Sequence, residues 1–195
     1  MQKLKVGYII GSLAKGSINR KLANALVKLA PAQLAMHEIG FGELPIYSYD
    51  YDASYPEVAT RFKEAIAASD AILFVTPEYN RSIPGGLKNA IDWATRPWGQ
   101  NAFKRMPCAV IGASPGNIST AVAQTHLRSI LIFCSAPIMT TVEAYIHFTK
   151  DLIGDDGTVA NAGTEEFLRN YMEEFRGFIE RVHTALGRTS LGAAS

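Results

Sequence analysis

Short apolar runs alternate along the chain with longer stretches in which apolar residues recur at helical spacing. The runs at residues 3–10 and 71–76 are nearly continuous in apolar character, which is typical of strands covered on both faces in a parallel sheet. Similar or weaker runs at residues 34–39, 107–113 and 138–144 predict three further strands. The chain is therefore expected to contain five strands.

Helical stripes separate these runs. Leu22, Leu26 and Leu29 lie on one stripe, and Pro31 ends the helix that they define. We expect Thr164 to cap the last helix, with two glutamates in its first turn. The remaining stripes consist of Val58, Phe62 and Ile66, then Leu87, Ile91 and Ala94, then Leu127, Ile130, Leu131 and Cys134, and finally Phe167, Tyr171, Phe175, Phe178, Ile179 and Val182.

Strands that alternate with helices predict an α/β fold. Right-handed crossovers then give a doubly wound five-stranded parallel sheet, for which we expect the order 2-1-3-4-5 and helices on both faces. A length of 195 residues suits one domain, expected over residues 1–186. Small and polar residues without periodicity at 187–195 predict a flexible tail.

Composition excludes several classes of partner. The chain has 19 Lys and Arg residues against 18 Asp and Glu, a net charge of +1, and no dense basic run that could follow a nucleic acid. No apolar stretch of about 18 residues is present to span a membrane. The first apolar run is too short for a signal peptide, so a cytoplasmic location is expected. Cys108 and Cys134 lie in apolar stretches, and we expect them to be buried and without chemistry.

Ligands of doubly wound sheets bind outside the carboxyl ends of the strands, where the strand order reverses. With the order 2-1-3-4-5, the loops at residues 11–19, 76–86 and 112–119 meet at one crevice. These three loops are the richest in Gly, Ser, Asn and Pro. The chemistry is therefore expected there.

The first loop reads GSLAKGSINR. Gly11 and Gly16 permit tight turns, and the hydroxyls of Ser12 and Ser17, the amide of Asn19 and the start of the next helix would surround a phosphate. The loop matches neither GxxxxGK[ST] nor GxGxxG, and it suits a single terminal phosphate, as on a mononucleotide. The alternative is a loop that only forms a turn.

The second loop contains TPEYNRSIPGG. Pro77 and Pro84 stiffen it, and Pro84 is placed to start a helix. Backbone amides at residues 78–80 could bind the polar edge of a flat heterocycle. The ring of Tyr79 would pack beside that heterocycle, or else anchor the loop.

Together, GSLAKGSINR, VTPEYNRSIPGGLKNAIDW and GASPG resemble the NADPH-dependent FMN reductase family, which includes bacterial chromate and quinone reductases. The resemblance spans residues 4 to 135. It implies a flavodoxin-like fold, bound FMN, NADPH or NADH as hydride donor, and dimers that often pair into tetramers. By similarity, the FMN phosphate would be held by Ser12, Ser17, Asn19 and Arg20, the isoalloxazine side by Pro77, Glu78, Tyr79 and Asn80, and the remaining edge by Ser114 and Gly116.

The chain departs from the family's pattern in the third loop. Ser119 stands where members often have Gly, and Val122 stands where they often have Arg. The role of that Arg is lost or moved. In the second loop, Arg81 would pair with an NADPH phosphate, or else lie on the surface as a solvated side chain.

The resemblance implies an FMN-dependent NAD(P)H oxidoreductase with a ping-pong cycle, in which hydride passes from the nicotinamide to flavin N5 and then to a quinone or other small acceptor. Free flavin, azo, nitro and chromate acceptors are further possibilities. No side chain needs to act as an essential acid or base. No metal-ligand spacing links the four histidines, His37, His126, His147 and His183.

Two other functions stay open at this stage. A flavodoxin-like electron carrier would bind FMN without turning over nicotinamide, although such carriers need an acidic docking face that a net charge of +1 does not favour. A phosphate-binding regulator would bind no FMN. For assembly, the aromatic loop at residues 47–55, with Trp93 and Trp98, offers apolar surface at which a dimer would complete each flavin site. An ordinary core position for Trp93 is the alternative.

Overall fold

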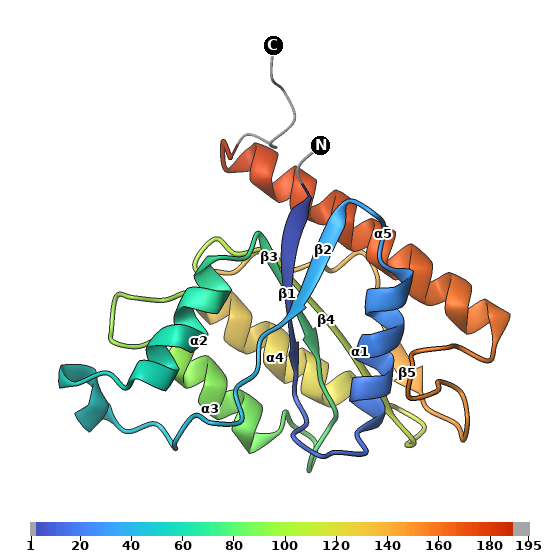
Figure 1. Cartoon of the computed structure of the whole chain (residues 1–195), viewed down its shortest axis with the longest axis horizontal. Helices are drawn as coiled ribbons and strands as arrows, with labels where there is room; N and C mark the ends of the chain where they lie inside the picture. Colours follow the sequence, from blue (N-terminus) through green and yellow to red (C-terminus); the bar gives the residue numbers. More distant parts are fainter. Residues whose placement is uncertain (1–2, 189–195) are drawn as a thin grey trace.

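Five parallel strands form one sheet in the computed structural model, which describes residues 3–188 (Figure 1). The strands are β1 (Leu4–Ile10), β2 (Leu34–Glu38), β3 (Ala71–Val75), β4 (Cys108–Ser114) and β5 (Tyr145–His147). Their order is β2-β1-β3-β4-β5, and each neighbouring pair is parallel. The predicted fold class and strand order are confirmed.

Helices cover both faces of the sheet. They are α1 (Ile18–Leu29), α2 (Glu57–Ala67), α3 (Gly85–Ala94), α4 (Ala121–Phe133) and α5 (Ala162–Ala185), with a short 3-10 helix, η1 (Tyr49–Ala53). One core lies between the sheet and α1 with α5, and the other lies between the sheet and α2, α3 and α4 (Figure 1). Leu73 and Val75 of β3 point into the first core, and Ile72 and Phe74 into the second. This alternation explains the continuous apolar run of a strand buried on both sides.

The predicted fifth strand at residues 138–144 is wrong. Ile138 makes only an isolated bridge with Cys108, whereas regular pairing begins where Tyr145 meets Gly112. Between these two contacts the edge segment, residues 138–145, is longer than the segment of β4 that it faces, residues 108–112. The intervening residues therefore leave the ladder. The strand lies at the edge of the sheet, where no outer neighbour requires continuous pairing.

Two predictions about the last helix also need correction. Asn161, not Thr164, caps α5, because its side-chain Oδ1 accepts a hydrogen bond of 2.8 Å from the Thr164 amide. Phe167 is exposed, and Leu168 is buried in its place. The apolar stripe of the helix therefore runs through Leu168, Tyr171 and Phe175.

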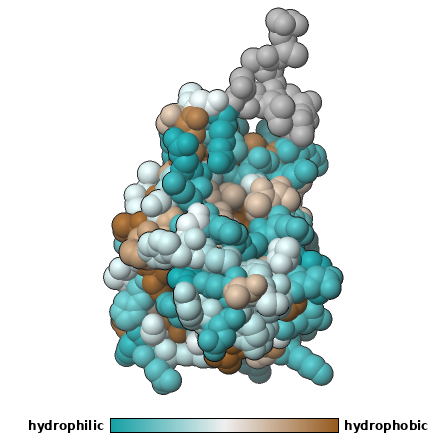
Figure 2. Space-filling model, turned by 90° about the vertical axis from the view of Figure 1, so that its left-hand side faces the viewer, coloured by the Kyte–Doolittle hydropathy of each residue, from teal (hydrophilic) through white to brown (hydrophobic). Residues whose placement is uncertain are grey.

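Both cysteines are free thiols within the core, as expected, and burial raises the pKa of Cys108. Across residues 3–188, no helix has both the length and the apolar character needed to cross a membrane. The side on which η1 lies shows small apolar patches between polar ones (Figure 2). The division into a domain over residues 1–186 and a tail over 187–195 stays a prediction, and residues 189–195 lie outside the described residues.

Candidate active site

Three loops leave the carboxyl ends of the neighbouring strands β1, β3 and β4. We call residues 11–17 the first loop, 76–84 the second and 115–120 the third. The backbones are tied together where they leave the sheet, since the Gly11 amide donates to the Val75 carbonyl at 2.8 Å and the Thr76 amide to the Ile111 carbonyl at 3.0 Å. A Cβ at Gly11 would lie 2.8 Å from Thr76 Oγ1, so only glycine permits this approach.

The first loop ends at the start of α1, where Ser17 is the N-cap residue but its side chain makes no capping hydrogen bond. Ser12 and Ser17 are both buried. Within the first turn the Arg20 amide donates to the Ser17 carbonyl at 3.0 Å, which leaves the amides of Ile18 and Asn19 without an intrahelical acceptor. The positive end of the helix dipole favours an anion there. A Cβ at Gly16 would meet nothing within 4 Å, so the loop leaves open space beside these donors.

Asn19 lies in that first turn, but its side chain serves the scaffold. Its Nδ2 donates to the Ala113 carbonyl and its Oδ1 accepts from the Ala113 amide, both at 2.9 Å. The residue is fully buried. Any contact of Asn19 with a phosphate must therefore come from its backbone N–H, because its side chain is occupied.

Two cations line a cavity of about 330 Å³ beside the first loop. Arg20 forms a bidentate ion pair with Glu38, at 2.8 and 2.9 Å, and this hydrogen bonding lowers the pKa of Glu38. Lys15 and Ser12 line the same cavity. In the pattern GxxxxGK[ST] the lysine follows the second glycine, whereas Lys15 precedes Gly16, so that pattern does not single out Lys15. A lysine inside a Gly- and Ser-rich loop is the signal that was available.

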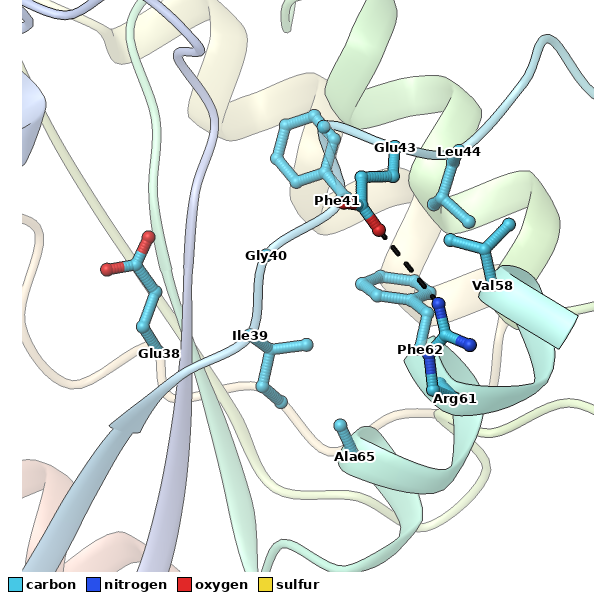
Figure 3. Close-up of a pocket in the computed structure, with 11 residues that line it drawn as sticks. Glu38, Ile39, Gly40, Phe41, Glu43, Leu44, Val58, Arg61, Phe62 and Ala65 are labelled. Atoms are coloured by element: carbon cyan, nitrogen blue, oxygen red, sulfur yellow. Dashed lines mark ion pairs between the residues drawn. The ribbon is translucent and has the colours of Figure 1, made fainter.

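A second cavity, of about 400 Å³, adjoins the first and is shown in Figure 3. It lies between residues 38–44 and α2, and its walls are mainly apolar, with the rings of Phe41 and Phe62 among them. The ion pair between Glu43 and Arg61, at 4.0 Å, crosses it. No residue of the three loops lines this cavity, so we assign it no part in the site.

The second loop contains a tight turn. The amide of Tyr79 donates to the Ser82 carbonyl at 2.9 Å, and the amide of Ser82 donates back at 3.0 Å. Asn80 and Arg81 have φ of 50° and 61°, which is the pattern of a type I′ turn. The Tyr79 amide is thus occupied, which leaves the amides of Glu78 and Asn80 for a ligand. The Tyr79 ring is half exposed and does not anchor the loop.

The carboxylate of Glu78 points to α4. Its Oε2 accepts hydrogen bonds from the amides of Val122 and Ala123, each at 3.0 Å, and its Oε1 accepts one from Arg81 Nη1 at 3.1 Å. The side chain is only 7% exposed. The predicted contact of Glu78 with an isoalloxazine ring can therefore come from its backbone, while its side chain joins two loops. No local spacing in the sequence reveals this link, because the two segments are far apart along the chain.

The third loop begins after Ser114, the last residue of β4. The Gly116 amide donates to Ser114 Oγ at 3.2 Å, and the Gly116 carbonyl lies 3.2 Å from His147 Nδ1. Ser119 has a φ of 50°, and its hydroxyl donates to the Ile146 carbonyl at 2.7 Å. This left-handed backbone is one that glycine adopts without strain and serine does not. The structure thus holds Gly116 between Ser114, at the end of β4, and His147 of β5.

The aromatic loop packs on α3. Trp93 is fully buried, and the rings of Tyr47, Tyr51 and Tyr55 lie with their centroids 5.1–5.3 Å from it. The core alternative is therefore right for Trp93, which is not part of an exposed surface. Trp98 is 78% exposed.

The predicted site residues lie on these three loops and on the first turn of α1, at one edge of the sheet. A profile of proteins described as NADPH-dependent FMN reductase matches residues 4–151. The chain belongs to this family. It is an NAD(P)H-dependent oxidoreductase with FMN as its cofactor. The structure fits that cofactor, because the unused cap of α1 and the open space at Gly16 accommodate one phosphate, and the half-exposed Tyr79 lies on the neighbouring loop.

Similar proteins cover nearly the whole chain. A 2-hydroxy-1,4-benzoquinone reductase of Burkholderia sp. is 44% identical over 176 residues, which is 90% of this chain and 96% of the relative. A quinone reductase of Escherichia coli K12 is 36% identical over 185 residues, 93% of this chain and 98% of the relative. The solved structure of FerB, a flavoenzyme NAD(P)H:(acceptor) oxidoreductase from Paracoccus denitrificans, is 46% identical with a TM-score of 0.87, over 91% of this chain and 98% of FerB.

Proposed function

We propose that this member of the family is a quinone reductase. FMN, when bound, would supply the redox chemistry for a ping-pong cycle between NADPH or NADH and a quinone-like acceptor. The observation that supports the proposal is the start of α1, where Ser17 makes no capping hydrogen bond, next to the strand β3 whose following loop carries the exposed Tyr79. The chain's residues bind and orient the reactants.

The first loop would hold the phosphate of FMN. The hydroxyls of Ser12 and Ser17 and the first-turn amides of α1 supply hydrogen bonds, and Lys15 and Arg20 supply positive charge from the adjoining cavity. Arg20 already holds Glu38, so its charge is partly neutralised before the phosphate arrives. Lys15 is therefore the stronger source of net positive charge.

The second and third loops would hold the flavin ring. Pro77, the amides of Glu78 and Asn80, and the Tyr79 ring are on one side, while Ser114 and Gly116 are on the other. The main-chain N–H groups of these loops would stabilise negative charge on the ring. None of these residues needs to donate or accept a proton in an obligatory step.

The acceptor is proposed from the relatives. Proteins with 44% and 36% identity over nine-tenths or more of this chain are named as benzoquinone and quinone reductases. A crevice that admits a nicotinamide ring also admits a planar quinone. Free flavin, azo and nitro compounds and chromate are further candidates that the same crevice would admit.

We also propose a homodimer in the cytoplasm, and tetramers formed from two such dimers, as the resemblance implies. Three large apolar side chains are exposed on and near the aromatic loop: Ile46 (80%), Tyr49 (74%) and Trp98 (78%). Burying them against a second copy removes this apolar surface from water. The two reduced thiols and the nicotinamide reductant support the reducing cytoplasm.

Anaerobic stopped-flow absorption tests the reductase. NADPH or NADH should bleach the FMN-loaded protein, and 1,4-benzoquinone added afterwards should restore the oxidised spectrum. Initial rates against both substrates should give parallel double-reciprocal lines. An FMN-loaded protein that neither nucleotide bleaches would instead be an electron carrier, and a protein that binds no FMN would be neither.

A further inference from the structure

The side chains of Glu78 and Arg81 form an ion pair that the proposed flavin site does not use. The two residues lie three apart, on either side of the turn in the second loop, and Arg81 Nη1 donates to Glu78 Oε1 at 3.1 Å. Their environments differ sharply, because Glu78 is 7% exposed whereas Arg81 is 67% exposed. One partner is thus fixed in the protein and the other faces solvent.

Glu78 is fixed by α4. The two amide hydrogen bonds to its Oε2 come from the first turn of that helix, where the helix dipole favours a negative charge. A second contact from α4 reaches the same turn, since His126 Nδ1 lies 3.1 Å from Ser82 Oγ. The carboxylate therefore has a defined position even though it belongs to a loop.

The ion pair leaves most of the Arg81 guanidinium exposed to solvent. A guanidinium carries five N–H donors, and the ion pair uses one of its two terminal nitrogens. The backbone supports the same arrangement, because the φ of 61° at Arg81 is a conformation that arginine rarely adopts and that the turn imposes. A strained turn and a buried anchor together hold a cation at the edge of the second loop.

We propose that Glu78 is a positioning residue that holds the Arg81 guanidinium for a phosphate group of the nicotinamide co-substrate. The inference rests on the proposed function, which brings that co-substrate to this loop. A mobile arginine loses side-chain entropy when it binds a phosphate, and the anchor removes part of that cost in advance. The phosphate is either the 2′-phosphate of NADPH or the pyrophosphate that NADPH and NADH share.

Calorimetry on the FMN-loaded protein separates these two sources without turnover. The probes are adenosine 2′,5′-bisphosphate, which carries the 2′-phosphate, and ADP-ribose, which carries the pyrophosphate. Arg81→Asn removes the charge, and asparagine tolerates the left-handed backbone of the turn. We expect this variant to weaken one of the two probes by about tenfold, as for a charge-assisted hydrogen bond at an exposed site. Lys88→Gln, which removes a nearby cation held by Asp92, should change neither.

Glu78→Gln is the decisive variant. Its amide oxygen can still accept from α4, but it has no charge with which to hold Arg81. We expect it to weaken the same probe about threefold, and to have no further effect in the Arg81→Asn background. Weakening of both probes alike, no weakening at all, or an undiminished effect in the double variant would each overturn the proposal.

Two measurements keep the outcomes distinct. Bleaching of the wild-type protein by NADPH tests the proposed function, and the calorimetry gives its answer whether or not bleaching occurs. If Glu78→Gln does not fold, nitrogen-15 relaxation of the wild-type Arg81 guanidinium decides. Slow rotation about its terminal bonds supports the anchor, and free rotation refutes it.

Discussion

Asn19 and Ala113 exchange two hydrogen bonds, each 2.9 Å long, between the side-chain amide of the first and the backbone of the second. The side-chain amide of Asn19 thus pairs with the backbone of Ala113 in β4 as a peptide group of a neighbouring strand would. This contact fixes the first turn of α1 relative to the third loop. The scaffold therefore sets the position of the proposed anion site at the start of α1 before any phosphate binds.

Replacing Asn19 should destabilise the apoprotein. Asn19→Ala leaves a buried N–H and a buried C=O without partners, which should lower the free energy of unfolding by about 2–4 kcal/mol. Asn19→Asp should cost at least as much, because a carboxylate cannot donate to the Ala113 carbonyl. Urea denaturation without FMN measures both. If Asn19 were only a phosphate ligand, the apoprotein would keep its wild-type stability.

Lys15 of the first loop and Arg20 of α1 should make the protein bind FMN more tightly than riboflavin, which lacks the phosphate. Lys15→Gln is expected to weaken FMN binding about tenfold, and Arg20→Gln less, because Arg20 is already paired with Glu38. Neither should alter riboflavin binding. Lys21→Gln is the matched control on α1, since Lys21 is paired with Asp155. Flavin fluorescence titration provides the dissociation constants, and an equal loss for both flavins would place these cations outside the phosphate site.

Ser119 combines a favourable hydrogen bond with an unfavourable backbone. Ser119→Ala loses the bond to the Ile146 carbonyl and keeps the φ of 50°, so it should be about 1 kcal/mol less stable than wild type. Ser119→Gly loses the same bond but removes the strain of the left-handed backbone. Its free energy of unfolding should therefore be about 1 kcal/mol higher than that of the alanine variant. Denaturation midpoints at equal m-values test the order. An alanine variant as stable as the glycine variant would show that the backbone carries no strain.

The segment after β5 should loosen in acid. Hydrogen bonds from the Thr158 hydroxyl and amide, with Lys28 nearby, lower the pKa of Asp156 from 3.8 to about 2. A pKa that is lower in the folded state contributes stability above the unfolded value, and that contribution is lost as the pH falls from about 4 to 2. The difference in melting temperature between wild type and Asp156→Asn should therefore shrink over this window. A difference that is constant down to pH 2 would contradict the shift, as would a carboxyl carbon-13 titration near pH 4.

The sequence predicted the sheet because parallel strands buried on both faces leave a continuous apolar signal, as at residues 71–75. It misplaced the fifth strand, because an edge strand needs only one partner and the apolar residues at 138–144 pack on the core with no more than the one bridge at Ile138. The candidate site loops were predicted from their content of Gly, Ser, Asn and Pro, and their role in the site stays a prediction. The side-chain partners of Glu78 and Asn19 were not predicted, because both side chains bond to backbone groups that lie far away in the chain. Local patterns carry no information about such partners.

The exposed apolar surface near the aromatic loop should be a dimer interface. Arg96 packs against the aromatic loop. Its guanidinium lies over the rings of Tyr47 and Tyr49 and pairs with Asp52 at 2.7 Å. This holds Tyr49 in an exposed position, and Trp98, two residues after Arg96, is also exposed. An exposed tryptophan is a frequent hot spot, so Trp98→Asp should weaken the dimer by at least about 2 kcal/mol, or roughly thirtyfold.

Light scattering over a concentration series measures this effect. Wild type should be a dimer or larger at micromolar protein, and Trp98→Asp should shift toward the monomer. Val27→Asp is the control, because Val27 is an exposed apolar residue of α1 on the other face of the sheet. If the neighbouring chain completes the flavin site, the affinity for FMN should fall together with the dimer in Trp98→Asp and stay unchanged in Val27→Asp. A wild-type monomer at these concentrations would remove the interface, and it would leave the flavin site to the three loops of one chain.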